Sequence, residues 1–375
     1  MGTEVNINTN MLTWAIARAG YDLYDFASKV PNIFEWIQGE KKPTIKQLEK
    51  FSKKVYLPLG YFFLPEPPKE KLPIPFFRTN DIQATQVSVN VYDTILLLQQ
   101  RQDWLKDYLK DSDFETLGFV GKYRSSSNIQ EIIADLRRNL NLTENWASYY
   151  KTWQDALESL IRHIEDIGII TVFNGIVENN TYRPISVDEC RGFVLVDEIA
   201  PFMFINNSDG KAAQMFTIVH ELAHIWIGHS AGFDFRKLQP ANDPIEKLCD
   251  KIAAEFLVPE ITFKKVWNSN PNIKNAARFF KVSEIVIARR ALDLGKIAKY
   301  KFFEFYDEYI NREFIKKEYQ SSGGDFYATT RKRLGLAFSA HINNAVKSGK
   351  LLYRDAYKLT GLKGDTFQTY FNKHI

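Results

Sequence analysis

The chain has few of the features that mark secreted and membrane proteins. Its 375 residues contain only two cysteines, Cys190 and Cys249, which excludes a disulfide framework and a zinc site built from four cysteines. The N-terminal stretch has neither a basic segment nor an apolar core, and no long uninterrupted apolar run occurs anywhere. We therefore expect a cytoplasmic protein with no signal peptide, no transmembrane helix and no membrane partner.

Charge and repetition are also weak signals in this sequence. The formal net charge at pH 7 is only +4, which permits contact with nucleic acid without arguing for it. The chain shows no internal repeats. Hydrophobic residues make up 45% of it, which is ample for real cores, and a chain of 375 residues suits two or three domains.

The clearest chemical signal is the sequence HELAH at residues 220–224. It lies within a long apolar run, and two residues that are four apart share one face of a helix. His220 and His224 could therefore bind one metal ion together. Glu221 would then act as the general base, as in zinc peptidases. The intact Glu221 favours a catalytic site, because a structural site needs ligands but no base.

A second predicted helix downstream offers the third metal ligand. Glu246 lies 22 positions after His224 and could complete a His-His-Glu set, which leaves one coordination position open for water. Asp250, one turn later, could accept a hydrogen bond from the outer nitrogen of a ligating histidine. Glu255 is the competing ligand. It lies nine positions after Glu246, so the two carboxylates face nearly opposite sides of one helix and only one can reach the metal.

Proline, glycine and apolar periodicity divide the chain into four predicted parts. Short helical runs with tight turns between residues 8 and 64 are typical of a helix-turn-helix bundle. Five prolines between residues 65 and 75 exclude a helix there and indicate a linker. The predicted fold is α+β and mostly helical, with a helix-turn-helix domain at 1–65, a linker at 66–83, a zincin-like metallopeptidase domain at 84–320 and a basic, helical C-terminal module at 321–375.

Three β-rich segments precede the metal helix and predict a small sheet beside it. They are residues 169–173, 192–197 and 202–206. In zinc peptidases of this plan, an edge strand holds an extended substrate by backbone pairing. The last segment is the candidate for that strand, through Phe202, Phe204 and Asn206; the alternative is an ordinary interior strand.

The expected recognition helix of the N-terminal bundle contains few residues suited to reading DNA. Only Asn32 and Gln38 suit the edges of bases, and Glu35 would repel phosphate. Lys41 and Lys42 nearby could contact phosphates. The sequence leaves open whether this domain binds DNA or docks a protein partner.

Several segments resemble the ImmA/IrrE family of bacterial metallo-endopeptidases. The similarity lies in FTIVHELAHIWIG at 216–228, IAAEFLVP at 252–259, RGF at 191–193 and AP at 200–201. Segments at 36–40, 43–44, 47–48 and 58–65 resemble the XRE-like helix-turn-helix of a subset of that family. Matched residue by residue, the family's metal ligands fall on His220, His224 and Glu246, and its general base falls on Glu221. Asp250 stands where the family often has Asn, and either side chain can accept the hydrogen bond.

The resemblance implies a zinc-dependent, cytoplasmic endopeptidase that cleaves one specific repressor and so relieves repression of stress-response or mobile-element genes. Longer members with a helix-turn-helix often look like components of toxin–antitoxin-type operons, which implies a toxin encoded in the same operon as a partner. One alternative is a DNA-binding regulator or antitoxin whose metal site is structural or inactive. Another is a zinc hydrolase that acts on something other than a peptide. The oxyanion could be stabilised by a tyrosine, His229 or Arg191, and the sequence does not choose.

Overall fold

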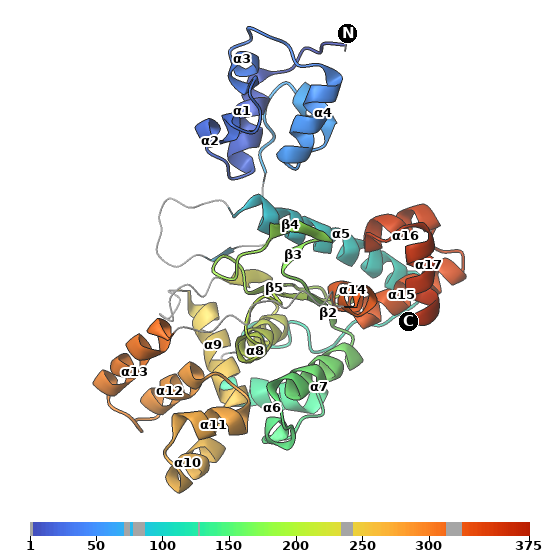
Figure 1. Cartoon of the computed structure of the whole chain (residues 1–375). Helices are drawn as coiled ribbons and strands as arrows, with labels where there is room; N and C mark the ends of the chain where they lie inside the picture. The colour runs from blue at the N-terminus through green and yellow to red at the C-terminus, as the bar shows by residue number, and fades with distance from the viewer. Residues whose placement is uncertain (1–2, 71–75, 78–86, 127, 234–242, 313–324) are drawn as a thin grey trace. The chain divides into compact units, whose positions relative to one another are not determined.

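A computed structural model of the whole chain describes residues 3–70, 76–77, 87–126, 128–233, 243–312 and 325–375 (Figure 1). Within these residues the protein is α+β and mostly helical, which confirms the predicted fold class. None of the described helices is both long and apolar enough to cross a membrane. The contacts between residues divide the chain into two compact units: unit 1 comprises Met1–Pro73 and Gln83–Ile95, and unit 2 comprises Ile74–Ile82 and Leu96–Ile375.

Unit 1 contains a bundle of short helices with well-defined starts. Asn8, Asp22 and Thr44 each accept hydrogen bonds from backbone N–H groups of the turn that follows, and Thr44 also forms a capping box with Gln47. The apolar faces of the helices meet in one core around Phe51. The elements of this bundle are α1 (Thr9–Arg18), α2 (Leu23–Ala27), α3 (Ile33–Ile37), α4 (Ile45–Lys54) and the 3-10 helix η1 (Leu59–Phe63).

Unit 2 is organised around a mixed sheet. In the described part of the chain its strand order is β1-β7-β5-β6-β2. Strand β5 is antiparallel to both β6 and β7, whereas β2 runs parallel to β6 and β1 runs parallel to β7. The strands are β1 (Phe76–Phe77), β2 (Ile170–Phe173), β5 (Gly192–Leu195), β6 (Phe202–Ile205) and β7 (Ala231–Phe233), and a separate hairpin is formed by β3 (Ile176–Val177) and β4 (Asn180–Pro184).

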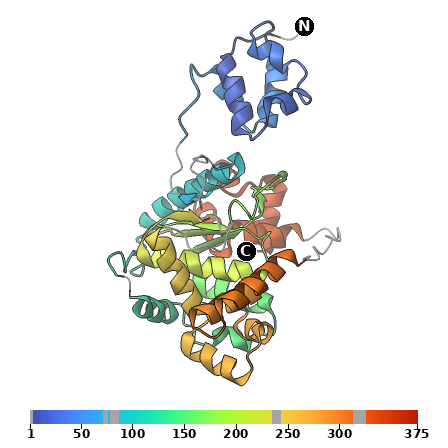
Figure 2. The same ribbon diagram turned by 90° about the vertical axis from the view of Figure 1, so that its left-hand side faces the viewer.

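Helices cover both faces of this sheet (Figures 1 and 2). Val194 and Met203 belong to the core that contains helix α8 (Lys211–Ile227). Phe202 points the other way and meets Phe338 of helix α15 (Leu336–Lys347), with ring centroids 5.6 Å apart. Because successive side chains of a strand alternate between the two faces, every residue of β5 and β6 is buried. The sheet therefore lies between two helical layers, one of which contains the metal helix.

The remaining helices extend these two layers. On the side of α8 lie α6, α7 and α9, which all pack against it, and the helical region from α10 to α13 continues from α9. On the opposite side lie α5 and the C-terminal helices (Figure 1). The bounds are α5 (Val89–Lys110), α6 (Ile129–Asn139), η2 (Trp146–Tyr149), α7 (Trp153–Asp166), α9 (Pro244–Leu257), α10 (Glu260–Ser269), α11 (Ile273–Phe280), α12 (Glu284–Asp293), α13 (Lys299–Asn311), α14 (Phe326–Leu334), α16 (Tyr353–Thr360) and α17 (Gly364–Lys373).

The C-terminal helices pack within unit 2 instead of forming a separate compact unit. Between α14 and α15, Gly335 has φ +81°, and a Cβ atom there would lie 2.6 Å from the carbonyl oxygen of Thr171 in β2, so only glycine fits. Arg101 of α5 donates hydrogen bonds to the carbonyl oxygens of Leu359 and Arg333, near the ends of α16 and α14. The sequence predicts a module from residue 321 but not that it folds onto the sheet; residues 321–324 lie outside the described ranges.

The expectation of a substrate-binding edge strand at 202–206 is wrong. Strand β6 lies between β5 and β2 and pairs with both along its whole length, from Phe202 to Ile205. Phe204 is buried there, and its ring stacks on that of Phe193. Asn206 is also buried and donates from Nδ2 to the carbonyl oxygens of Ile185 and Cys190. The alternating pattern identified a strand correctly, but it carries no information about which neighbours pair with that strand.

Candidate metal centre

The metal helix α8 is held firmly at its C-terminal end. Gly228 adopts a left-handed conformation with φ +83°, and the N–H groups of Gly228 and His229 donate to the carbonyl oxygen of His224 at 2.8 and 3.0 Å. The next two carbonyls, of Ile225 and Trp226, accept N–H groups from the loop before α6. This capping leaves few carbonyls of the last turn free and fixes the register of the helix next to the site.

The indole of Trp226 fixes the rotation of the same helix. Its Nε1 donates to Oδ2 of the buried Asp135 on α6 at 3.1 Å, and its ring stacks on Phe119 with centroids 4.4 Å apart. The opposite face of α8, which carries His220 and His224, is thereby directed toward α9.

Helix α9 supplies the third candidate ligand from its first turn. Asp243 accepts hydrogen bonds from the backbone N–H groups of Ile245 and Glu246, and Pro244 occupies the first turn, where its missing N–H costs nothing. The side chain of Glu246 is fully buried against α8. The structure thus brings the carboxylate to the two imidazoles, as the sequence spacing predicts.

Three potential ligand atoms converge between the two helices. Nε2 of His220 lies 3.1 Å from Nε2 of His224 and 3.1 Å from Oε2 of Glu246, and Nε2 of His224 lies 3.2 Å from Oε1 of Glu246. Among the described residues these three side chains form the one group of His, Cys, Asp or Glu able to hold a metal ion. All three are buried.

Asp250 lies one turn further along α9 and contacts the back of the first imidazole. Its Oδ1 is 3.0 Å from Nδ1 of His220. If Nδ1 carries the proton, the unprotonated Nε2 of His220 points to the centre of the group. Asp250 is partly exposed, with 32% of its side chain accessible.

The pKa values of His220, His224 and Glu246 depend on one another, because these side chains are buried in contact. Burial would lower the pKa of His220, but hydrogen bonds with Asp250 and Glu246 outweigh it and raise that pKa to about 10. Burial would raise the pKa of Glu246, but hydrogen bonds from His220 and His224 lower it to about 2. Burial lowers the pKa of His224. These directions follow from the close contacts of the His220 ring with the carboxylates of Glu246 and Asp250.

Glu221 is the most unusual side chain of the site. It is fully buried, and within the described part of the chain neither carboxylate oxygen has a hydrogen-bond partner. Burial raises its pKa to about 8, an effect that nearby His220 reduces and Glu246 increases. Leaving a carboxylate buried and unpaired lowers the stability of the fold, which is typical of a side chain kept for function.

A zinc ion fits the residues that are present. Tetrahedral ligands about 2.0–2.2 Å from zinc stand roughly 3.3 Å apart, close to the separations of 3.1–3.2 Å between the three ligand atoms. In the described structure, Nδ1 of His224 and both oxygens of Glu221 are buried without a hydrogen-bond partner. Two nitrogens and a carboxylate with one coordination position left open form the donor set of a catalytic zinc.

Glu255, the competing ligand, lies at the other end of α9 and has a different role. Its carboxylate pairs with Arg290 of α12, and Oε1 accepts the backbone N–H of Glu260 at 3.1 Å. Since this places it among the helices α10 and α12, it takes no part in the metal-binding group. The argument from helical rotation therefore distinguishes the two glutamates correctly.

The structure gives no support for either of the two residues named as candidates for stabilising the oxyanion, His229 and Arg191. His229 is exposed. Arg191 forms an ion pair with Asp209, with 3.5 Å between Nη1 and Oδ2.

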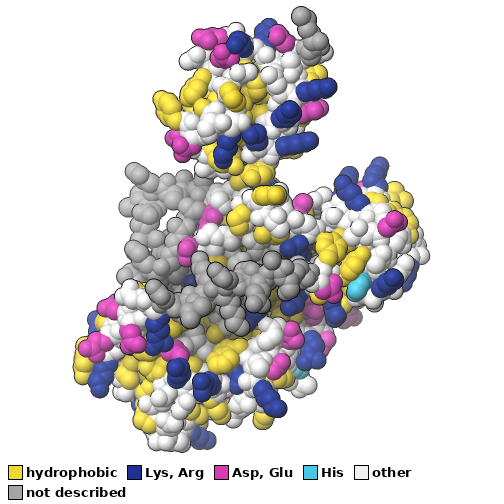
Figure 3. Space-filling model, viewed as in Figure 1, with side chains coloured by type: hydrophobic (Ala, Val, Ile, Leu, Met, Phe, Trp, Pro, Cys, Tyr) yellow, Lys and Arg dark blue, Asp and Glu magenta, His cyan; other side chains and the backbone are white. Residues whose placement is uncertain are grey.

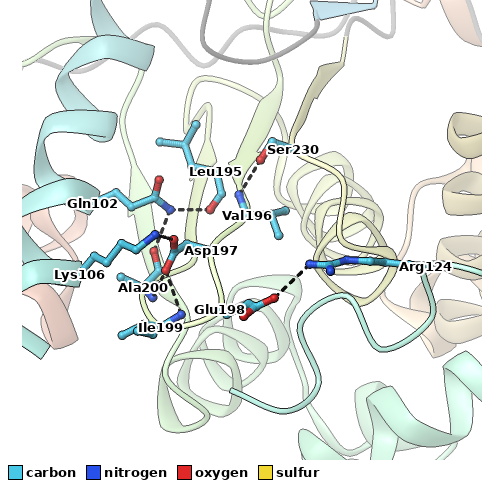
Figure 4. Close-up of polar contacts among 10 residues, drawn as sticks. All are labelled: Gln102, Lys106, Arg124, Leu195, Val196, Asp197, Glu198, Ile199, Ala200 and Ser230. Atoms are coloured by element: carbon cyan, nitrogen blue, oxygen red, sulfur yellow. Dashed lines mark hydrogen bonds and ion pairs between the residues drawn. The ribbon is translucent and has the colours of Figure 1, made fainter. Parts of the chain in front are cut away.

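The β5–β6 turn is bound tightly to α5 (Figure 4). Nε2 of Gln102 donates to the carbonyl oxygens of Leu195 and Ala200, both at 2.8 Å. Lys106 forms an ion pair with Asp197, whose Oδ1 also accepts two backbone N–H groups of the turn. Nothing in the local sequence pattern identifies this network, because its partners come from distant parts of the chain.

The same turn is bound to the segment that leaves the metal helix (Figure 4). The N–H of Val196 donates to Oγ of Ser230 at 2.8 Å, one residue before β7 begins. Arg124 and Glu198 add an exposed ion pair on the outside of the turn. Strand β7, which the sequence did not predict, pairs with β5 directly after this anchored segment.

The residues proposed for DNA or partner contact all lie on the surface of unit 1. Asn32, Gln38, Lys41 and Lys42 are exposed. Nζ of Lys41 lies 2.8 Å from the carboxylate of Glu35, so its charge is partly neutralised. Figure 3 shows other Lys and Arg side chains along the right-hand side of unit 1, where α4 carries the exposed Lys46, Lys50, Lys53 and Lys54.

Comparison with known proteins gives two matches to protein families. Residues 166–292 match the family described as the IrrE N-terminal-like domain, Peptidase M78, and residues 334–373 match a domain of unknown function, DUF8813. No curated protein and no solved structure matches the chain. The first match spans β2 to α12, with the whole candidate metal centre, and supports a metallopeptidase-like function of the ImmA/IrrE kind.

Proposed function

We propose that the protein is a zinc-dependent endopeptidase. His220, His224 and Glu246 would hold the zinc ion, Glu221 would be the general base, and Asp250 would orient His220. The observation that carries the proposal is the convergence of three buried ligand atoms beside a buried carboxylate that has no partner among the described residues. The peptidase family match over the same residues supports it independently.

The chemistry follows from these side chains. Zinc in this site would act as a Lewis acid that activates water and polarises a peptide carbonyl group. Glu221 would take the proton of the attacking water and pass it to the amine that leaves. A positive charge among the ligands would also lower the pKa of Glu221 from its value of about 8, so that the carboxylate is ionised and able to accept that proton. Asp250 would keep Nε2 of His220 unprotonated for the metal.

The substrate we propose is a regulatory protein of the repressor type, in a stress-response, mobile-element or toxin–antitoxin setting. This part rests on the likeness to the ImmA/IrrE family and on the peptidase match. Both cysteines are buried and neither forms a disulfide, which is compatible with the cytoplasmic setting that we expect.

The test uses the full chain loaded with zinc and the repressors encoded beside its gene. Wild type should cut one of them at a defined bond, identified by mass spectrometry, and Glu221→Gln should leave it intact. Glu255→Gln is the matched control, because it changes a carboxylate on the helix that carries Glu246 but outside the metal group. Equal cleavage by wild type and Glu221→Gln would contradict the proposal.

A second candidate function is that of a DNA-binding regulator or antitoxin, which could coexist with the first. The exposed lysines of α4, together with Lys42 and Asn32, favour it, whereas Glu35 weighs against it. Affinity for duplex DNA that falls steeply with salt would support this candidate. Binding to a neighbouring toxin but not to DNA would instead make unit 1 a protein-docking domain.

A further inference from the structure

The two edges of the sheet in unit 2 are covered in different ways. In β2, the N–H groups of Ile170 and of Asn174, just past the strand, bond toward β6, so the carbonyl group of Thr171 faces outward. Gly335 lies directly against that carbonyl oxygen, and α14 and α15 pack on the strand. This edge is covered by a helical region with its own buried core residues and has no room for a peptide.

At the other end of the sheet, the two-residue strand β1 covers β7, the strand that follows the metal helix. Strand β7 begins three residues after the helix-ending Gly228 and is fixed to β5 on one side. On its other side the described structure holds β1, which has only two residues, Phe76 and Phe77. Phe76 pairs with Gly232 and Phe77 with Phe233, in parallel orientation.

Along the sequence, the residues around β1 alternate between the two compact units. Residues Met1–Pro73 belong to unit 1, Ile74–Ile82 to unit 2, and Gln83–Ile95 to unit 1 again. Both ends of the segment that carries β1 are therefore joined covalently to unit 1. Two residues of strand form few hydrogen bonds, so their pairing with β7 is weak compared with that of the other strands.

The candidate metal centre is closed in the same conformation. Glu221 and Glu246 are fully buried, and His224 is 1% exposed. A peptide bond cannot reach these groups while they stay buried, so cleavage requires a change in the chain around them. An extended peptide that enters beside the metal helix would need the backbone of β7, because strand addition at a sheet edge is how such enzymes align an extended chain.

We propose that β1 is an internal competitor for the substrate: Phe76–Phe77 occupies the edge of β7 on which an extended peptide substrate would pair, and cleavage requires its release. This inference rests on the proposed peptidase function. It assigns the substrate strand to Ala231–Phe233 in place of the rejected segment 202–206, and it makes Phe76–Phe77 an inhibitor of the metal centre.

The first experiment joins β1 to β7 by a disulfide. In the full-length, zinc-loaded protein, Phe77→Cys with Phe233→Cys places two thiols at directly paired positions, within reach of a disulfide. Each single variant is a control, and the natural cysteines are both buried. Cleavage is measured on a pool of quenched fluorescent peptides. We expect cleavage to fall at least about tenfold on oxidation and to return on reduction in the double variant alone.

The second experiment weakens the pairing of β1 with β7. Phe77→Pro removes a backbone N–H and disfavours the strand, whereas Phe77→Ala keeps that N–H and serves as the control. We expect hydrogen exchange in the peptide covering 229–233 to accelerate about tenfold in the proline variant, with faster cleavage of the same pool and an unchanged zinc content. The alanine variant should change both quantities less.

The outcomes separate the two proposals. Failure of the disulfide to form, equal cleavage by the oxidised and reduced double variant, or unaltered exchange over 229–233 in Phe77→Pro would overturn the inference. If every form binds one zinc and none cleaves any peptide, the proposed function fails instead. The exchange measurement still decides in that case whether β1 covers β7.

Discussion

Unit 2 contains two groups of polar side chains that differ in how well their hydrogen-bonding groups are matched. Around the β5–β6 turn, Gln102, Lys106 and Asp197 meet partners of the opposite kind, donors against acceptors (Figure 4). Between α8 and α9, atoms that can all accept a proton or a metal point at one another, and Glu221 has no hydrogen-bond partner in the described structure. A matched network stabilises the fold, whereas an unmatched one costs stability and indicates a site kept for a ligand.

The strongest test of this comparison is the unmatched carboxylate. Glu221→Gln should lower the rate of substrate cleavage about 100- to 10,000-fold, the usual contribution of a general base. Zinc content should not change, because Glu221 is not one of the three converging ligands. Kinetics on the identified substrate, with zinc measured in the same samples, provide the check; loss of zinc together with activity would mean that Glu221 is itself a ligand.

Glu255 lies on the same helix as Glu246 but has an ion-pair partner, Arg290. Replacing it should therefore change stability and leave metal binding intact. Glu255→Ala leaves Arg290 without its ion-pair partner, and both side chains are largely buried, so we expect a loss of about 3 kcal/mol in the free energy of unfolding. Denaturant unfolding measures it. Zinc should still bind at one ion per chain, and a variant that loses the metal would break the distinction between the two ends of α9.

Asp250 combines features of both groups. Its carboxylate has a hydrogen-bond partner, Nδ1 of His220, but that histidine belongs to the candidate metal centre. Asp250→Ala should weaken zinc binding about 10- to 100-fold, because His220 loses the acceptor that fixes its tautomer. Asp250→Asn retains an acceptor and should stay near wild type. A competition titration against a chelator gives both affinities, and equal weakening in the two variants would show that the charge of Asp250 matters more than its hydrogen bond.

The smallest effect is expected in the matched network. Gln102→Leu leaves the carbonyl oxygens of Leu195 and Ala200 without their donor and should reduce stability by about 1–2 kcal/mol. Gln102→Glu makes a useful comparison, because a carboxylate next to two carbonyl oxygens should be worse than leucine. Zinc affinity should be unaffected in either folded variant, and a change in it would place the turn within the site.

Local spacing in the sequence predicted that His220, His224 and Glu246 lie close together. The four-residue interval between His220 and His224, and the position of Glu246 on the next helix, depend only on helical periodicity. The same rule separates Glu246 from Glu255. These predictions hold because each concerns side chains on one helix or on two helices that follow one another.

Non-local pairing could not be predicted in the same way. The segment 202–206 reads correctly as a strand, yet its place between β5 and β2 depends on segments far away in the chain. Strand β7 is too short to show a pattern, and β1 lies in a proline-rich segment that reads as a linker. Gly335 reads as an ordinary turn residue, and only the close approach to Thr171 shows why it is glycine.

The central claim is that the unmatched group between α8 and α9 is a zinc site. The most direct test is the metal content of purified wild type beside His220→Ala and Glu246→Ala. One zinc per wild-type chain, lost in both variants while both remain folded, is the result that this account predicts. No zinc in wild type, and no uptake when zinc is supplied, would contradict it.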